Sequence, residues 1–365
     1  MRAIFDGSLR LAPSFMKLTL KFCLLGVIYT VAALAATSTV ELPESISDNA
    51  VAILKLHGQF ELFSLMGIGP KKTWNAVTTA GYQLDAVSGK AKTIHSVLGT
   101  AGRIAAMAIG ASDRVFLFGG YVVFQGGGMA VPDANLYEPD HDRWLRLPDV
   151  PTAVGDAVIG VYRDRYIYLI GGRSNGRLVS DVQIYDTDKT KWMSGTPSPG
   201  PAVFGHAGAL VGNTIVYVDG AKANATGGGP RFIASDECWM GKIDHHNPAK
   251  IDWTKLPNHP GSGRFRIAGG GSEKDGTIYF SGGSDNPLDY NGVGFDGKPA
   301  EPSPVTFAFN VRSSKWETLD DNTPDPTMDH RGLLVTPEGL VIIGGMAKGQ
   351  QVTGRIDVLS KKPTK

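Results

Sequence analysis

The stretch Val115-Phe116-Leu117-Phe118-Gly119-Gly120 decides the fold, because close copies of it recur along the chain. Each copy is a run of β-branched and aromatic residues that ends in glycine. Clear copies occupy residues 166–172, 278–283 and 340–345, and weaker ones occupy residues 63–69 and 215–220. Such runs favour strands, and Gly reaches the positive φ that a tight turn requires. The chain therefore repeats one strand-and-turn unit six times, at intervals of about 50 residues.

A second signature follows most of these turns: an aromatic residue and, seven positions later, a Trp. Three copies keep both aromatics, running from Tyr137 to Trp144, from Tyr185 to Trp192 and from Phe309 to Trp316. The polar residues between them are typical of a hairpin turn. Together the two signatures predict four strands per repeat and an all-β, six-bladed β-propeller with almost no helix after residue 36. The Trp side chains are expected to be buried between blades.

The last repeat lacks an outer strand, because the chain ends soon after residues 355–359. Near the start of the chain, Val40-Glu41-Leu42-Pro43 has the same pattern as the outer strand at 144–148. We expect this N-terminal strand to close the last blade, so that no sheet edge is left open.

The charge balance of the chain limits its partners. The 365 residues include 36 Lys and Arg against 35 Asp and Glu, for a formal net charge of +1. This balance provides no attraction to nucleic acid or to an anionic membrane. A small or neutral partner is therefore expected.

The N-terminus is predicted to be a signal peptide. Lysines precede the apolar run 22–35, which ends in the Ala-Leu-Ala pattern of a signal-peptidase site. We assign residues 1–35 to the signal peptide, with Met16 as an alternative start, and residues 36–365 to the propeller. Cleavage predicts a periplasmic or secreted protein without a membrane segment, and it leaves Cys238 as the one cysteine. A retained anchor is the alternative.

Strand directions bring one set of residues to one mouth of the central channel. The start of the innermost strand and the loop after the second strand lie at the same end of a blade, where propeller ligands bind. The candidate substrate-binding residues are Arg103, Asp156, Arg266 and Arg331 at strand starts, and Lys222, Arg231, Asp285, Asn286 and Tyr290 in loops. Such a ring at an exposed mouth suits a polyhydroxylated ligand that bears a carboxylate. The alternative is that Arg and Asp side chains pair only with each other.

Four ionisable residues are candidate acid and base groups. His206 and His330 have neighbouring glycines, which allow a ligand or the backbone to approach closely. Asp236 and Glu237 precede a strand and follow a long polar loop. A purely structural role is the alternative for each.

The Gly-Gly strands, the Tyr-to-Trp hairpins and the closing strand resemble kelch proteins. The order of blades is similar to that of the N-acetylneuraminate epimerases, the bacterial sialic acid mutarotases. This resemblance implies a kelch-type propeller that binds, and as an isomerase interconverts, a sugar such as sialic acid at the channel mouth. A second resemblance, through residues 282–292, is to bacterial kelch proteins labelled galactose oxidase.

The chain departs from both families at their reactive groups. The epimerases are expected to read Gly-Glu-Ala-Lys after the third turn, whereas this chain reads Gly220-Ala221-Lys222-Ala223, and Ala221 cannot transfer a proton. Arg231 can stand for the family's Arg, and Asp219, Asp236 or Glu237 for its acid. A copper-radical oxidase requires an adjacent Tyr-His pair, which this sequence lacks. We therefore expect no metal and no cofactor.

The sequence leaves three classes of function open. The first is a carbohydrate-directed enzyme or binder with a small sugar or glycan ligand. The second is a non-catalytic kelch module that binds a protein or a glycan. The third is a propeller enzyme of another kind.

Overall fold

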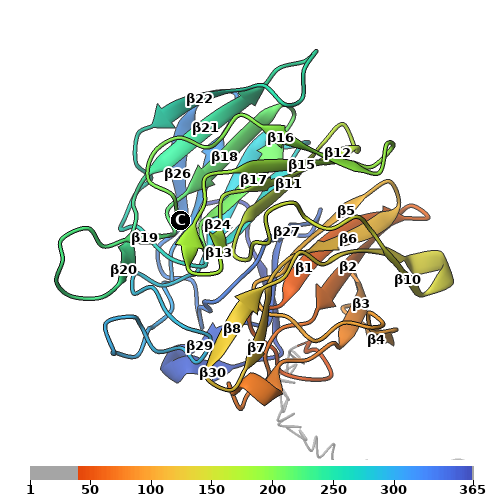
Figure 1. Cartoon of the computed structure of the whole chain (residues 1–365), viewed down its shortest axis with the longest axis horizontal. Coiled ribbons are helices and arrows are strands. Elements are labelled where there is room, and N and C mark those ends of the chain that lie inside the picture. The colour runs from red at the N-terminus through yellow and green to blue at the C-terminus, as the bar shows by residue number, and fades with distance from the viewer. Residues whose placement is uncertain (1–39, 364–365) are drawn as a thin grey trace, which may run out of the picture. The chain divides into compact units, whose positions relative to one another are not determined.

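The computed structural model describes residues 40–363 (Figure 1). The predicted signal peptide lies outside these residues. Regular structure in the described part is almost entirely strand, with three single-turn 3-10 helices at Trp74–Ala76, Pro139–His141 and Lys348–Gln350. None of the helices in this part is long and apolar enough to cross a membrane.

Residues 40–363 form six antiparallel blades, which confirms the predicted fold. Five blades have four strands each. Blade 1 consists of β1 (Ala50–Leu56), β2 (Gln59–Leu65), β3 (Gly81–Asp85) and β4 (Ala91–Ile94), and blade 2 of β5 (Met107–Ala111), β6 (Arg114–Phe118), β9 (Ala134–Glu138) and β10 (Arg143–Arg146). Blade 3 consists of β11 (Val158–Tyr162), β12 (Tyr166–Ile170), β15 (Val182–Asp186) and β16 (Lys191–Gly195). Blade 4 consists of β17 (Ala207–Val211), β18 (Thr214–Val218), β21 (Cys238–Ile243) and β22 (Ile251–Leu256), and blade 5 of β23 (Ala268–Ser272), β24 (Thr277–Ser281), β25 (Thr306–Asn310) and β26 (Lys315–Asp320).

Blade 6 has three strands of its own, β27 (Leu334–Val335), β28 (Leu340–Ile343) and β31 (Ile356–Leu359). The first strand of each blade contacts the first strand of the next, and β27 contacts β1, so the inner strands complete a ring (Figure 1). The channel inside this ring has a volume of about 260 Å³ and is lined largely by Gly, Ala and aliphatic residues of the inner strands.

The Gly-Gly turns recur because neighbouring blades approach each other there. A Cβ on Gly119 would lie 2.1 Å from the carbonyl oxygen of Val154, and one on Gly282 would lie 2.2 Å from that of Thr327. In both pairs the glycine ends the second strand of one blade, and the carbonyl belongs to the loop that enters the next. Both glycines also have positive φ, 56° and 72°. Only Gly satisfies both demands without strain.

In the part of the chain that the structure describes, four short hairpins leave the propeller directly after these turns. They are β7–β8 (Tyr121–Phe124 and Gly127–Ala130), β13–β14 (Arg173–Ser174 and Arg177–Leu178), β19–β20 (Ala221–Ala223 and Phe232–Ala234) and β29–β30 (Met346–Ala347 and Gln351–Val352). Because each follows the second strand of its blade, all four project at the end of the propeller where the inner strands begin.

The repeated Trp residues link blades through their indole N–H groups. Trp144 donates to the carbonyl of His95 (2.7 Å), Trp192 to that of Pro148 (2.9 Å) and Trp316 to that of Pro257 (2.8 Å). Each acceptor belongs to the preceding blade. The rings are half-buried rather than buried as predicted, since each lies on an outer strand and its edge reaches the surface.

The N-terminal segment closes blade 6, as the sequence predicted. Glu41 forms an antiparallel bridge with Arg355, flanked by a hydrogen bond from the Leu42 N–H to the Gly354 carbonyl (2.7 Å). The pairing is one bridge long rather than a full strand, and Pro43 has no N–H with which to extend it. Leu42 and Ile46 are buried against blade 6, so side-chain packing supports this short contact.

Candidate functional site

A ring of left-handed residues narrows the channel where the inner strands begin. Each blade contributes one residue with φ between 54° and 69°, and these residues are Asp48, Ala105, Asp156, Gly205, Arg266 and Asp329. Backbone hydrogen bonds join neighbours around the ring: Asp156 donates to Ala105 (3.0 Å), Gly205 to Asp156 (2.9 Å) and Arg266 to Gly205 (2.7 Å). The blades are thus held together by main-chain bonds at this end of the channel.

Charged side chains fill the centre of the ring. The guanidinium groups of Arg266 and Arg331 both bind the carboxylates of Asp48, Asp156 and Asp329. These five residues, which we call the channel plug, come from blades 1, 3, 5 and 6, and their side chains are at most 5% exposed. The alternative in which Arg and Asp pair with each other therefore holds for Arg266, Arg331 and Asp156.

Burial and pairing compete at the carboxylates of the plug. Burial raises the pKa of Asp48 to about 6, although Arg266 and Arg331 oppose this shift. Burial acts in the same direction on Asp156, but there the two guanidinium groups outweigh it and lower the pKa. The plug holds three carboxylates and two guanidinium groups, so no positive charge is left over for an anionic ligand.

An aromatic layer covers part of the same end of the propeller. Phe204 packs edge-on against Phe265 and Phe232, with ring centroids 5.1 and 4.9 Å apart, and Phe232 packs in the same way on Phe295. The guanidinium carbon of Arg266 lies 4.9 Å from the centre of the Phe265 ring, so this layer contacts the channel plug. The channel plug is therefore packed against apolar side chains where it meets Phe265.

His206 and His330 pack between Gly-Gly turns. The His206 ring lies edge-on to Tyr217, 5.4 Å between centroids, and a Cβ on Gly171 would meet it at 3.1 Å. The His330 Nε2 lies 3.1 Å from the Thr327 hydroxyl. Burial lowers the pKa of both imidazoles to about 4, so both are neutral at pH 7. Their surroundings are those of packing residues, although both also contribute to the lining of the channel.

Arg103 lies apart from the channel plug. Its guanidinium donates to the carbonyls of Gly119 (2.9 Å) and Asp133 (3.1 Å) and holds a turn of its own blade. Arg264 has the same role in blade 5, where it donates to the Gly282 carbonyl (3.3 Å). The matching Gly-Arg dipeptides of the two repeats signal this equivalence, because Arg103 aligns with Arg264 and not with Arg266.

The two candidate acids after the polar loop lie on the side of blade 4. Asp236 accepts a hydrogen bond from Asn258 (3.0 Å). Glu237 accepts one from the Trp239 indole (3.0 Å) and pairs with Lys255 (3.2 Å). Both carboxylates are engaged locally, and neither lines the channel.

The loop of blade 5 forms a small structure of its own. Asn286 donates to the Asp296 carboxylate (2.9 Å), while Asp285 is exposed and Tyr290 half-buried. Among residues 40–363, no hydrogen bond or ion pair joins Asp285 or Tyr290 to the channel plug.

Lys222 and Arg231 are brought together in a pocket between the hairpins of blades 3 and 4. The pocket has a volume of about 320 Å³, and Leu178, Pro201 and Phe232 also line it. The Arg231 guanidinium stacks over the Phe232 ring (5.0 Å), and its Nη2 donates to the Gly176 carbonyl (3.3 Å). The remaining N–H groups of Arg231 and the ammonium of Lys222 have no carboxylate within 4 Å in the described part of the chain. We call this the hairpin pocket.

A third cation lies beside the hairpin pocket. The guanidinium of Arg173 lies 5.4 Å from the Phe232 ring and 5.6 Å from the Phe204 ring, and its buried Nε has no hydrogen-bond partner. Arg173 was not among the predicted site residues. The sequence does carry a signal for Arg173. It directly follows the Gly171-Gly172 turn of blade 3, in the position that Ala221 has after the Asp219-Gly220 turn of blade 4.

The comparisons with known proteins agree with this architecture. Residues 161–199 match the Kelch motif family. The chain is 32% identical over 174 residues to Kelch-like protein terF of Aspergillus terreus, over 47% of this chain and 33% of the relative. It is 27% identical over 145 residues to Beta-scruin of Limulus polyphemus, over 37% and 15%, and 26% identical over 122 residues to Kelch-like protein 15 of Gallus gallus, over 31% and 25%. The chain thus spans a third or less of the length of these relatives.

A solved structure, that of YjhT, aligns over 89% of this chain and 97% of its own, with a TM-score of 0.70 and 18% identity, which shows a shared fold. Six antiparallel blades around a central channel, closed by the N-terminal segment, define a β-propeller. The recurring Gly-Gly turns and the matched motif then identify its type: the chain is a kelch-repeat β-propeller.

Proposed function

We propose that this kelch propeller binds an acidic carbohydrate of the sialic acid kind in the hairpin pocket. The observation that carries the proposal is that Lys222 and Arg231 line one pocket and that, among residues 40–363, no carboxylate forms an ion pair with either. A guanidinium with free N–H groups matches the geometry of a carboxylate. The Phe232 ring and Leu178 supply the apolar wall against which a sugar face packs.

Binding, rather than catalysis, is the function that this pocket supports. The residues that line it include two cations but no carboxylate and no imidazole, whereas mutarotation requires a general acid and a general base near the ring oxygen. His206 and His330 are buried against Gly turns, and Asp236 and Glu237 are engaged elsewhere. On the strength of the signal peptide expected at residues 1–35, we place this activity in the periplasm or outside the cell.

Calorimetry with N-acetylneuraminate tests the proposal, and the methyl ester of the same sugar is the control because it keeps the ring and removes the charge. We expect heat with the acid and little with the ester. Arg231→Ala should weaken binding by about 1.5 to 3 kcal/mol, the range for a charge-assisted hydrogen bond. Lys255→Ala is the matched control, since Lys255 belongs to the same blade but pairs with Glu237.

Two results would count against the proposal. Equal binding of acid and ester would remove the role of the cations. No heat with any acidic sugar would leave a kelch module that binds a protein or a neutral glycan. NMR of anomer exchange provides a separate readout, in which we expect the rate with the protein to equal the rate in buffer.

A further inference from the structure

Blade 4 departs from the Gly-Gly pattern in a way that the hairpin pocket does not explain. Its turn begins with Asp219, whereas the corresponding residue is Gly119 in blade 2, Gly171 in blade 3 and Gly282 in blade 5. Asp219 has a φ of 64°, in the left-handed region that favours glycine. Its side chain is completely buried. A buried carboxylate in this backbone conformation, where other blades have glycine, indicates that the Asp219 side chain has a specific structural or binding role.

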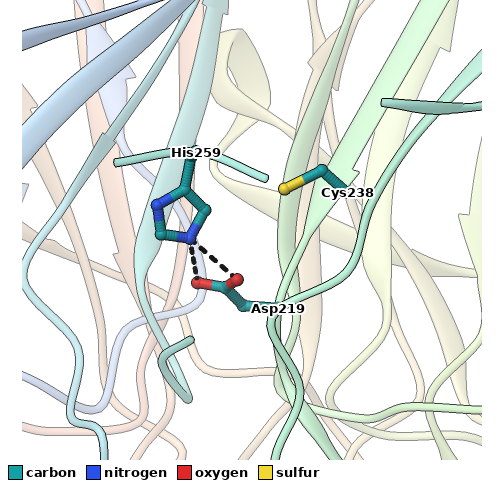
Figure 2. A group of neighbouring side chains, drawn as sticks. All are labelled: Asp219, Cys238 and His259. Carbon is teal, nitrogen blue, oxygen red and sulfur yellow. Dashed lines mark hydrogen bonds and ion pairs between the residues drawn. The ribbon is translucent and has the colours of Figure 1, made fainter. Parts of the chain in front are cut away.

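Two further donor groups surround this carboxylate. Cys238 begins β21, and His259 lies in the loop that leads from β22 to blade 5. One donor atom from each of the three side chains lies within 4.8 Å of the other two, and all three residues are buried. Figure 2 shows the imidazole facing the carboxylate and the Cys238 sulfur directed toward the space beside them. We call Asp219, Cys238 and His259 the buried trio.

The hydrogen bonds of His259 leave a place for a proton or a metal ion inside the buried trio. The Nδ1 lies 2.8 Å from the Pro260 carbonyl, which can only accept, so Nδ1 carries a hydrogen. In the neutral ring Nε2 is then an acceptor, yet it faces both Asp219 oxygens, at 2.8 and 2.9 Å. Two acceptors in contact in a buried site repel each other. Either a second proton or a metal ion has to lie between them.

We propose that the buried trio is a structural site for Zn²⁺. The Cys238 sulfur, His259 Nε2 and the two Asp219 oxygens supply four donor atoms of the types that zinc prefers, and a thiolate selects zinc over Mg²⁺ or Ca²⁺. Binding forms the zinc–sulfur and zinc–nitrogen bonds and releases the thiol proton, and any proton held between imidazole and carboxylate, to solvent. The imidazole and the carboxylate would have to separate by about half an ångström to reach zinc–ligand distances.

The groups around the buried trio are those of a metal site. A ligating imidazole usually donates its other N–H to a carbonyl or carboxylate, as His259 does to Pro260. The Asp219 carboxylate also accepts a hydrogen bond from the Arg264 N–H (3.0 Å), which orients it. The imidazole stacks on Phe307, 4.3 Å between centroids, which shields the site from water. A closed site of this kind is structural and offers no open position for a substrate.

The position of the site gives the ion a role in the fold. Asp219 and Cys238 are the two roots of the segment that carries the β19–β20 hairpin, and His259 belongs to the loop that enters blade 5. A bound zinc would therefore fix the base of the hairpin pocket to the next blade. The zinc site is independent of what the pocket binds, because metal content and spectra are measured without a sugar.

The test uses the full chain with Cys23→Ser, so that Cys238 is its one thiol. Because the buried trio excludes solvent, the protein is unfolded in denaturant with a chelator and refolded with one equivalent of Co²⁺ or Zn²⁺. We expect about one metal ion per chain by elemental analysis and a thiolate-to-cobalt charge-transfer band. Adding Cys238→Ser should abolish the band and weaken metal binding at least tenfold, while the circular dichroism spectrum shows that the variant still folds.

A matched control comes from a surface pair without a thiol. His95 Nδ1 lies 2.8 Å from the Asp142 carboxylate, and both side chains are exposed. His95→Asn should leave metal content and the cobalt band unchanged. Equal metal content in the protein with and without Cys238→Ser, or no charge-transfer band in the parent, would overturn the proposal and leave a His–Asp pair bridged by a proton.

Discussion

Arg266 of blade 5 reaches across the channel to Asp156 of blade 3 and binds its carboxylate with two N–H groups, Nε to Oδ1 at 3.2 Å and Nη2 to Oδ2 at 3.0 Å. The two residues are 110 positions apart, and blade 4 lies between their blades in the ring. Both side chains are almost fully buried. A charge pair in this position joins blades that share no strand contact, so the channel plug acts as a brace across the ring.

Arg266→Leu should lower the free energy of unfolding by about 3 to 5 kcal/mol, because it leaves three buried carboxylates with one guanidinium group, that of Arg331, instead of two. Urea denaturation followed by Trp fluorescence measures the change. The same substitution at Arg177, which is exposed on the β13–β14 hairpin, should shift the midpoint little. Equal midpoints for the parent and Arg266→Leu would show that the plug contributes nothing to stability.

Leu42→Ala should destabilise the protein by about 2 to 5 kcal/mol, the usual cost of truncating a buried leucine. Leu42 is 5% exposed and belongs to the segment that closes blade 6. Thermal unfolding followed by circular dichroism measures the effect. Val358→Ala, at a residue of the same blade that is 57% exposed, is the control. A Leu42→Ala melt that matches the parent would indicate that the N-terminal segment is not needed for closure.

Acid should destabilise the protein through its buried imidazoles. His330 has an ordinary pKa of 6.5 when unfolded, and burial lowers it to about 4 in the folded state. The folded state therefore binds fewer protons between these values, so the stability is present above pH 6.5 and is lost as the pH falls toward 4. His330→Gln should reduce this loss by about 3 kcal/mol, measured by urea denaturation at pH 7 and pH 4. His246→Gln, at an exposed position, should keep the parent's profile.

Trp192→Phe should cost about 1 to 3 kcal/mol, since it removes the indole N–H that binds Pro148 and part of the apolar surface between blades 2 and 3. Differential scanning calorimetry measures the change. Trp74→Phe is the matched control, because Trp74 is 44% exposed and lies outside the blades. If both variants melt at the same temperature, the repeated Trp has no linking role.

The architecture could be predicted because it is written in local repeats. A glycine with positive φ, a β-branched strand and a Trp at constant spacing impose the same conformation wherever they occur, so six copies predict six blades. The closing segment was also found by pattern, since Val40-Glu41-Leu42-Pro43 repeats the end of the outer strand at 144–148, with Leu42 in the position of Leu147. Each of these signals acts through the conformation of a few neighbouring residues.

The site could be predicted only in part. Strand direction correctly brought Asp156, Arg266 and Arg331 together at the start of the channel. The same reasoning grouped Arg103 with them, although a shift of two residues in the repeat places its guanidinium against the Gly119 carbonyl instead. Position along the chain predicts which end of the channel a residue lies at, but not the direction of its side chain.

The sequence by itself determined the number of blades, the glycine turns and the closing segment, because these depend on backbone conformation and on hydrophobic pattern within about ten residues. Only the tertiary structure decided which charged side chains are neutralised by ion pairs. Arg331 and Arg231 look alike in the sequence, yet Arg331 is buried against the carboxylates of the channel plug, and Arg231 has none within ion-pair distance in the described residues. The partners that neutralise a charge come from other blades, and distances between blades are set by the packing of the whole ring.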